Sequence, residues 1–571
     1  MLNNKGDRRI VSQTPSAAKN TIPDSRNSKE SSQSNMSDPL VTVKQGTLRG
    51  VEIRSVLGRP FIAFKGIPYA APPVGDLRFR DPQPAEPWIG IRDATEEGSK
   101  CAQESYLAKE FIVGGDDCLY LNVATTSLTG SRPVMFWIHG GAFTLGDGGF
   151  GLFGPDYLME SSNIVYVSIN YRLGILGFLN LDDEVAPGNM GLKDQVAALQ
   201  WVKENISQFG GDPNNVTIFG GSAGGASVHY LLLSPLAKGL FHKGIVESGV
   251  VLSPWANIEE TISHARRLVS MLGKDSTDPK EIVEFLRTLP LSELVMAQQR
   301  MLTDGVRMKD KNFLRYQFLP TIDNKSIRPF VHTDSFEEFV NQGIDVPVII
   351  GYASHEGIFF LRGMNEEEYA KLDGDFESTV PQDLAQKCPS KIKEIARAIR
   401  DYYFGDEKIT ADLVDNFVQF SGDYFFVRGI QKVVDVQMKK KSPMYLYRFS
   451  YASDSSLYKS IFGLQNTKGV THAAEIEYLF HATVFEEHIK SDLDSIETLM
   501  RRRFVRMWTD FAATGNPTPI VDDLITVEWK PVNGSAKNYL DIGAELVAGK
   551  NLGEDMLRAW KRIEAIADNN Q

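Results

Sequence analysis

A serine in a glycine-rich turn, between a strand-like run and a helix-like run, is the feature that most constrains this chain. Ser222 lies in the segment 219–225, Phe-Gly-Gly-Ser-Ala-Gly-Gly, which follows the β-branched run 216–218 and precedes the apolar run 226–233. A strand, a Gly-x-Ser-x-Gly turn and a helix are typical of a nucleophile elbow, whose strained turn accepts only small neighbours. The serine hydroxyl is then exposed at a helix N-terminus, where backbone amides stabilise an oxyanion. The pattern predicts a nucleophilic serine.

Apolar runs alternate with helical patterns along the chain, which predicts an α/β fold. Continuous apolar strands separated by helices indicate a mostly parallel sheet that is covered on both faces. The segment 192–202 places its apolar residues on one helical face, and a long helix at 494–513 ends at a Gly-Asn-Pro stop signal. We expect helical caps over the carboxyl ends of the strands at 256–340 and 365–440. The expected strands are 134–138, 164–169, 216–219, 243–247, 346–352 and 444–449.

A serine nucleophile needs a base and an acid that orients this base, and α/β-hydrolases place them in the order serine, acid, histidine. Glu356 follows the strand-like run ending at Tyr352, and His472 lies in the later segment 469–475, so both fit that order. Taken alone, a glutamate after a strand is more often a solvated loop residue, and acids at other strand exits could compete. An isolated loop histidine is more often inert. Three further histidines lie in helical or packing contexts and are weaker candidates: His229, His242 and His481.

The segment 139–143, His-Gly-Gly-Ala-Phe, directly follows the expected strand 134–138. Small residues let backbone amides approach a substrate carbonyl. We therefore expect the amides of Gly141 and Ala142, with that of Ala223, to form an oxyanion hole. A plain glycine turn is the alternative, but a His-Gly-Gly strand exit upstream of an elbow is the more specific signal.

The composition is that of a globular protein, with 42% hydrophobic and 23% charged residues in 571. A net charge of -12 argues against nucleic acid or an anionic membrane surface as a partner, since both select basic patches. Residues 1–37, rich in Ser, Asn, Lys and Thr, are expected to form a disordered tail, with Met36 as an alternative start. We expect residues 38–571 to form the catalytic domain. With no signal peptide or membrane span seen, the default compartment is the cytoplasm.

The three cysteines are Cys101, Cys118 and Cys388, and this odd count does not indicate a disulfide framework. Cys101 and Cys118 could close a short loop that would stabilise the fold by about 3 kcal/mol if oxidised. A reducing cytosol would leave them as thiols. No Cys-x-x-Cys or His-Glu-x-x-His pattern is present, so we expect neither a metal site nor a cofactor.

Several motifs in order resemble the type-B carboxylesterase/cholinesterase family over about residues 40–560. The motifs are the Ser222 elbow, the His139 loop, Phe-Lys-Gly-Ile-Pro-Tyr-Ala-Ala-Pro-Pro-Val-Gly at 64–75, Asp-Cys-Leu-Tyr-Leu-Asn-Val at 117–123 and Gly-x-x-His-x-x-Glu at 469–475. The segments 188–195 and 253–256 are similar to the insect intracellular alpha-esterase branch.

The resemblance implies an α/β-hydrolase fold with a catalytic triad and an oxyanion hole. The implied triad is Ser222, Glu356 and His472, and the implied oxyanion hole is Gly141, Ala142 and Ala223. It also implies that Ser248 hydrogen-bonds the triad acid and that Cys101 pairs with Cys118. Trp255 and Phe360 would shape the acyl pocket, although plain core packing explains them equally well. Arg78 and Asp116 match a structural ion pair of the family.

The chain departs from the family at two places. Gly221 stands before the nucleophile where the family usually has glutamate, and juvenile hormone esterases usually have glutamine there. The loss of a carboxylate should weaken stabilisation of the imidazolium and any preference for cationic leaving groups. The segment 101–118 also lacks the tryptophan with which cholinesterases bind quaternary ammonium. Acetylcholine is therefore an unexpected substrate.

These features predict an esterase that acts on neutral hydrophobic carboxylic esters, such as xenobiotic or lipid esters, in a detoxification role. The partner is a small-molecule ester, and the expected assembly is a monomer or homodimer. A slow esterase that sequesters organophosphates is one alternative, suggested by Gly221. A non-catalytic binding protein on the same fold is another, although all three triad residues are present.

Overall fold

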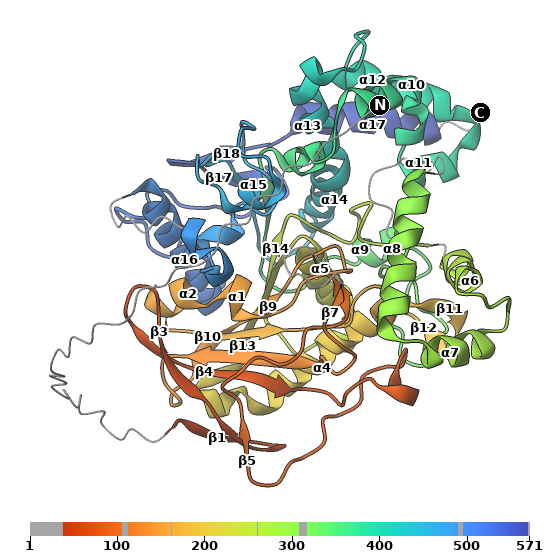
Figure 1. The fold of residues 1–571 in the computed structure, drawn as a ribbon. Coiled ribbons are helices and arrows are strands. Elements are labelled where there is room, and N and C mark those ends of the chain that lie inside the picture. Colours follow the sequence, from red (N-terminus) through yellow and green to blue (C-terminus); the bar gives the residue numbers. More distant parts are fainter. Residues whose placement is uncertain are drawn as a thin grey trace, which may run out of the picture. The chain divides into compact units, whose positions relative to one another are not determined.

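An eleven-stranded sheet forms the centre of the fold, in the order β18-β17-β16-β15-β14-β13-β9-β10-β8-β4-β3 (Figure 1). The computed structural model describes residues 38–105, 112–161, 163–259, 261–307, 317–488 and 495–568. The predicted tail at 1–37, with Met36, lies outside these residues, so the tail and its boundary stay predictions. From β10 through β17 in sheet order, every neighbouring pair of strands is parallel. The antiparallel strands lie at the two edges.

The strands expected from apolar runs are all present. They are β9 (Arg132–Ile138), β10 (Val165–Ile169), β13 (Gly211–Gly221), β14 (Lys243–Glu247), β15 (Val348–Ala353) and β16 (Met444–Phe449). Every residue of β10, β14 and β15 is buried, as expected for strands covered on both faces. The apolar runs did not predict the outer strands of this sheet, which are β3 (Val51–Arg54), β4 (Pro60–Pro68), β8 (Tyr120–Thr125), β17 (Asn538–Ile542) and β18 (Leu546–Lys550). The α/β prediction is confirmed.

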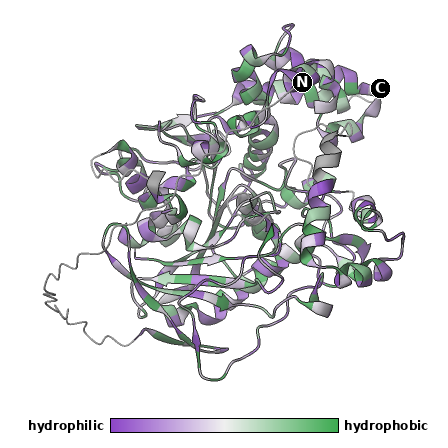
Figure 2. Ribbon diagram, in the orientation of Figure 1, coloured by the Kyte–Doolittle hydropathy of each residue, from purple (hydrophilic) through white to green (hydrophobic). Residues whose placement is uncertain are grey.

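Helices cover both faces of the sheet, and the residues of β9 alternate between them. Val134, Phe136 and Ile138 pack with α4 (Met190–Asn205) and α5 (Ala223–Leu233). Met135 and Trp137 belong to a second apolar cluster with α16 (Ile496–Thr514). Side chains of a strand point alternately to its two faces, so one short strand contributes to two cores. In Figure 2 the hydrophobic colour follows the inner strands, while the outer helices carry both colours.

The predicted end of the long helix α16 is confirmed. Gly515 has φ 78° in the left-handed region, and its amide donates to the Phe511 carbonyl at 2.8 Å. Glycine is favoured at this position because it has no Cβ to clash. Among the described residues, no helix is long and apolar enough to cross a membrane.

The two segments predicted to be helical caps do contain helices. The first holds α6 (Ile262–Met271), α7 (Pro279–Thr288), α8 (Leu291–Arg307) and α9 (Phe336–Asn341). The second holds α10 (Glu366–Gly374), α11 (Gln382–Lys387), α12 (Ile392–Tyr403), α13 (Val414–Gly422), a π-helical turn at Asp423–Val427 and α14 (Arg428–Gln437). The terminal helix α17 (Glu554–Asp568) packs on α12 and α11 (Figure 1).

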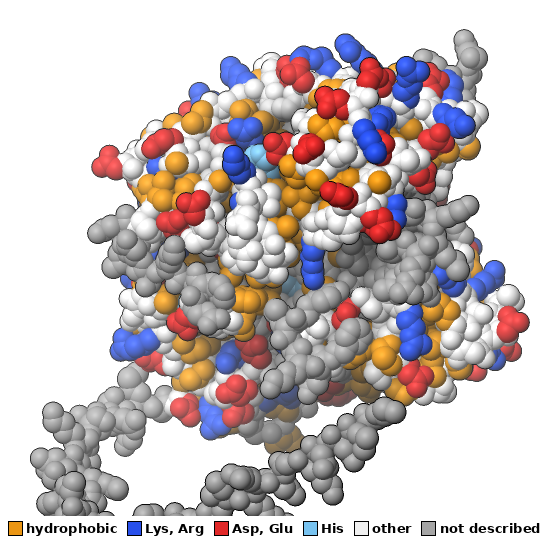
Figure 3. All heavy atoms as spheres, turned by 45° about the horizontal axis from the view of Figure 1, so that its top comes forward, with side chains coloured by type: hydrophobic (Ala, Val, Ile, Leu, Met, Phe, Trp, Pro, Cys, Tyr) orange, Lys and Arg blue, Asp and Glu red, His pale blue; other side chains and the backbone are white. Residues whose placement is uncertain are grey.

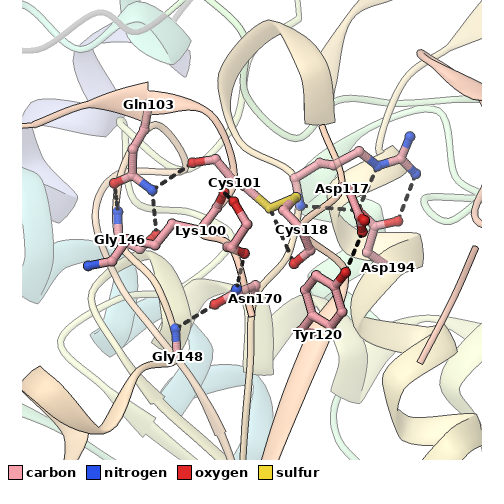
Figure 4. Close-up of a disulfide and its surroundings, with 12 residues drawn as sticks. Lys100, Cys101, Gln103, Asp117, Cys118, Tyr120, Gly146, Gly148, Asn170 and Asp194 are labelled. Atoms are coloured by element: carbon pink, nitrogen blue, oxygen red, sulfur yellow. Dashed lines mark hydrogen bonds and ion pairs between the residues drawn. A yellow bond between two sulfur atoms is a disulfide. The ribbon is translucent and has the colours of Figure 1, made fainter. Parts of the chain in front are cut away.

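A disulfide joins Cys101 to Cys118 (Figure 4). The family resemblance implied this pairing, whereas the expectation of two free thiols in a reducing compartment does not match the structure. Beside it, the Arg78 guanidinium contacts the Asp116 carboxylate at 2.6 Å, as the resemblance also implied. Cys388 is buried and forms no disulfide among the described residues.

Asp423, in the π-helical turn, makes the stability of the fold depend on pH. Its carboxylate accepts from the Tyr403 hydroxyl at 3.0 Å, and burial raises the pKa of Asp423 to about 7. The folded state thus binds this proton more tightly than the unfolded state does. Its contribution to stability is present below about pH 4 and is lost as pH rises toward about 7.

We predict that Asp423→Asn gains stability relative to the wild type as pH rises, because the amide stays neutral. Thermal unfolding at about pH 5 and about pH 8 measures this difference. Asp412→Asn, at an exposed position just before α13, is the control. If Asp423→Asn and the wild type lose stability in parallel, the buried Asp423 carboxyl is not the cause.

Candidate active site

Ser222 lies at the sharp turn between β13 and α5. Its φ of 58° and ψ of -122° place a non-glycine residue in a strained region of backbone conformation. Its amide donates to the Glu247 carbonyl at 2.8 Å, which ties the turn to the next strand. A Cβ on Gly220 would lie 2.6 Å from the Ile138 carbonyl oxygen, and one on Gly224 only 2.0 Å from it. The glycines of the motif are therefore required by close backbone contact.

Glu356 and His472 meet although 116 positions separate them in the chain. His472 Nδ1 lies 2.6 Å from Glu356 Oε2, and since an ionised carboxylate only accepts, the ring nitrogen donates. The other oxygen, Oε1, accepts from the Ala353 amide at 2.8 Å and from Ser248 Oγ at 2.5 Å. The Glu356 side chain is 1% exposed, and both of its carboxylate oxygens accept hydrogen bonds, so its orientation is fixed. The structure thus brings the predicted acid, base and Ser248 together.

Ser222 and His472 line the same cavity, whose volume is about 2690 Å³. Within the described part of the chain, Ser222 Oγ makes no hydrogen bond. Hydrogen bonds between catalytic groups are often long in unliganded enzymes and tighten when substrate binds. Gly141, Ala142 and Gly221 line this cavity too, so the predicted groups share one space.

The amides predicted to hold an oxyanion are available. Those of Gly141 and Ala142 donate to no acceptor among the described residues, and Ala223 is the first residue of α5. Amides of the first helical turn have no partner inside their helix. A Cβ on Gly140 would lie 3.1 Å from Ser222 Cβ, so the loop lies directly against Ser222.

Aromatic side chains line much of the cavity. Trp255 and Phe360, the predicted acyl-pocket residues, both lie on its wall. Trp255 Nε1 donates to the Phe425 carbonyl at 3.0 Å, and the Phe360 and Phe425 rings are 4.5 Å apart. Both residues are also largely buried, so packing and pocket roles coexist. In Figure 3 hydrophobic side chains gather in the hollowed centre of the face, with charged groups of both signs around them.

The sequence did not indicate Phe426, whose ring centroid lies 4.5 Å from that of His472. Phe426 belongs to the π-helical turn Asp423–Val427. Such a turn changes the direction in which a side chain leaves the helix, compared with a regular α-helix. The sequence carries no signal for such a turn, and only the run of aromatics at 424–426 marks the segment.

Two more buried acids lie near the pair of Glu356 and His472. Glu475 Oε1 accepts from Tyr447 OH at 3.0 Å and lies 3.1 Å from Ser248 Oγ, whose proton goes to Glu356. Burial, with the nearby charge of Glu356, raises the pKa of Glu475 to about 7. Glu247 ends β14 and accepts from Trp508 Nε1 at 2.7 Å, and burial, with nearby Glu475, raises its pKa well above the usual range. The described residues contain no group of three or more His, Cys, Asp or Glu side chains arranged to hold a metal ion.

The comparisons with known proteins agree with this geometry. Residues 37–560 match the model of the family described as "Carboxylesterase family". The chain belongs to this family. It is 34% identical over 519 residues to Esterase FE4 of Myzus persicae, covering 88% of each chain. It is 32% identical to Liver carboxylesterase of Sus scrofa, covering 92% of this chain and 93% of that one.

A solved structure extends the comparison to the fold. Juvenile hormone esterase from Manduca sexta, with OTFP covalently attached, matches with a TM-score of 0.82 and 28% identity. The match covers 93% of this chain and 100% of that one. This carboxylesterase is therefore an α/β-hydrolase and a serine esterase that hydrolyses carboxylic esters.

The position of Gly221 gives a testable consequence. A Cβ there would lie 2.9 Å from Ile476 Cδ1 and 3.8 Å from Glu247 Oε2. We predict that Gly221→Ala destabilises the fold by less than about 1 kcal/mol, because the end of the Ile476 side chain can shift. Gly221→Glu should cost about 1–3 kcal/mol more, since it adds volume and a second acid beside Glu247. Denaturant unfolding of both variants measures their free energies of unfolding. Equal stability of the two variants would contradict the expected crowding at position 221.

Proposed function

We propose that the chain hydrolyses neutral, hydrophobic carboxylic esters with Ser222, Glu356 and His472 as its triad. The observation that carries this proposal is the 2.6 Å contact of His472 with Glu356 beside the cavity that Ser222 enters. Gly141, Ala142 and Ala223 supply the oxyanion hole, and Ser248 holds Glu356. Trp255 and Phe360 bound the acyl group.

The reaction follows from these positions. His472 takes the proton of Ser222, whose oxygen attacks the ester carbonyl, and the backbone amides hold the resulting oxyanion. The imidazolium then gives its proton to the leaving alcohol as the carbon–oxygen bond breaks, which leaves an acyl-serine. A water, deprotonated by His472, attacks this ester and releases the acid and Ser222. Glu356 holds the imidazole in the required orientation throughout.

Neutral, apolar substrates fit the walls of the cavity best. Aromatic rings on the wall bury the apolar area of a substrate, and a cationic leaving group would be stabilised by a negative charge close to Ser222. The raised pKa values of Glu475 and Glu247 favour their neutral forms, so neither offers a full negative charge. Gly221 contributes no carboxylate. Slow turnover with covalent capture of organophosphates remains the second candidate, favoured by Gly221.

A monomer or homodimer, a cytoplasmic location and a detoxification role remain predictions.

Removal of the nucleophile tests the triad. We predict that Ser222→Ala lowers kcat for p-nitrophenyl esters at least about 10⁴-fold, since the acyl-enzyme cannot form. Ser227→Ala is the matched control, because Ser227 lies in the same helix, its hydroxyl accepts from Gln195 Nε2 at 3.0 Å, and it is not among the residues that line the cavity. Equal rates for Ser222→Ala and wild type would refute the enzyme mechanism. One rapid turnover followed by a stalled enzyme, with an organophosphate, would favour the capture function.

A change in the pocket wall tests the substrate class. We predict that Phe360→Leu raises kcat/KM for longer or branched acyl groups relative to acetate by about 10-fold, the scale of one or two methylenes in a pocket. Rates across a series of acyl lengths measure this ratio. If all esters change by the same factor, Phe360 is only a packing residue.

A further inference from the structure

His139, directly after β9, makes a contact with the next residue that the mechanism above does not use. Its side chain is fully buried, and its ring stacks on Tyr171 with centroids 4.4 Å apart. Its Nδ1 lies 2.8 Å from the Gly140 carbonyl oxygen. A carbonyl oxygen can only accept, so Nδ1 carries the proton and donates. The Tyr171 hydroxyl donates to the His139 carbonyl at 3.0 Å, which fixes the backbone of the histidine.

This contact sets the direction of the Gly141 amide. The Gly140 carbonyl and the Gly141 N–H belong to one peptide plane, and in a trans peptide they point in opposite directions. A carbonyl held toward the His139 ring therefore turns the Gly141 N–H away from that ring. This amide has no acceptor among the described residues, and Gly140 itself lies against Ser222.

Gly146 packs against both partners of the hydrogen bond between His139 and Gly140. Gln103 accepts from the Gly146 amide at 2.7 Å and donates to the Gly146 carbonyl at 2.9 Å (Figure 4). A Cβ on Gly146 would lie 2.5 Å from Gly140 O and 2.5 Å from His139 Nδ1. The paired hydrogen bonds from Gln103, two residues after the disulfide cysteine Cys101, thus hold Gly146 where it packs on both partners.

The His139 ring donates one hydrogen bond and does not act as an acid or base at physiological pH. Burial lowers the pKa of His139 to about 4, so the ring is neutral at physiological pH. Asp147 and Lys100 are the charged groups that act on it, with opposite signs. A neutral imidazole has one N–H, and here the Gly140 carbonyl takes it.

We propose that His139 is a positioning residue that fixes the Gly140–Gly141 peptide with the Gly141 amide directed at the oxyanion, with Gln103 and Gly146 holding it in place. This inference rests on the proposed function, since it assigns a cause to the geometry of the oxyanion hole. Without the His139 donor the peptide can rotate, which would remove one donor from the hole or place a carbonyl oxygen there. Loss of one oxyanion donor lowers kcat by about 10²–10³-fold in a comparable hydrolase.

Two substitutions of His139 separate the hydrogen bond from packing. In asparagine the amide nitrogen is bonded to Cγ, as Nδ1 is in histidine, so His139→Asn keeps a donor at that place. His139→Leu removes it, and both variants lose the stacking on Tyr171. We measure kcat and KM for a p-nitrophenyl ester. We also measure the affinity for an alkyl trifluoromethyl ketone, which forms an oxyanion on Ser222, and for the alcohol of the same skeleton, which does not.

We expect His139→Leu to lose about 10²-fold in kcat and in ketone affinity, with KM and alcohol affinity nearly unchanged. His139→Asn should recover most of both losses. Equal losses in the two variants, or equal weakening of ketone and alcohol, would overturn the proposal. If His139→Leu does not fold, Gln103→Leu replaces it, and an unchanged ratio of ketone to alcohol affinity in that variant overturns the proposal.

Ser222→Ala in the same assay distinguishes this proposal from the proposed function. An inactive Ser222→Ala beside a fully active His139→Leu overturns the role of His139 alone. Full activity of Ser222→Ala overturns both.

Discussion

The close backbone contact between the end of β9 and the turn after β13 is the constraint on which the site depends. The two strands are parallel neighbours, and Gly220 is paired in register with Ile138. A Cβ on Gly140 would lie 2.7 Å from the Gly221 carbonyl oxygen, so the loop after β9 touches the elbow through backbone atoms. Side chains on these glycines would push the two segments apart. The distance between Ser222 and the amides of the loop after β9 is therefore set by the sheet, and this loop cannot be moved independently of the elbow.

Two buried acids, Glu356 and Glu475, lie close to each other near His472. Ser248 Oγ contacts Glu356 at 2.5 Å and Glu475 at 3.1 Å, so it lies between two acids. Like charges so close in a buried region do not both ionise readily. Burial, with the nearby charge of Glu356, raises the pKa of Glu475 to about 7, whereas the Glu356 carboxylate is held by the His472 ring, the Ala353 amide and Ser248. Of these two acids, Glu356 is the one that contacts His472.

The sequence predicted the fold correctly where local patterns carry the information, and the same patterns supplied the candidate residues. The apolar strands and the elbow follow from residue type and spacing, and Gly515 marks the end of α16 because the backbone there needs a left-handed conformation. The edge strands were missed, because a short antiparallel strand such as β18 has exposed residues and little apolar pattern. The contact of Phe426 with His472 was missed because it depends on a π-helical turn, which residue spacing does not specify. The chain order of Ser222, Glu356 and His472 was readable, but their meeting depends on the exits of strands far apart in sequence.

The environment of Gly221 changes the physical interpretation of its departure from the family. The sequence showed only that a carboxylate usual in the family is missing beside Ser222. In the structure the position faces Ile476, and the nearest acid is Glu247 on the adjacent strand. Burial favours the neutral form of that acid, and it accepts from Trp508 rather than contacting His472. The wall beside Ser222 is therefore apolar and filled instead of charged or empty. Under the proposed mechanism, the imidazolium of His472 contacts Glu356 and not Glu247, and the apolar wall supports the proposal of neutral ester substrates.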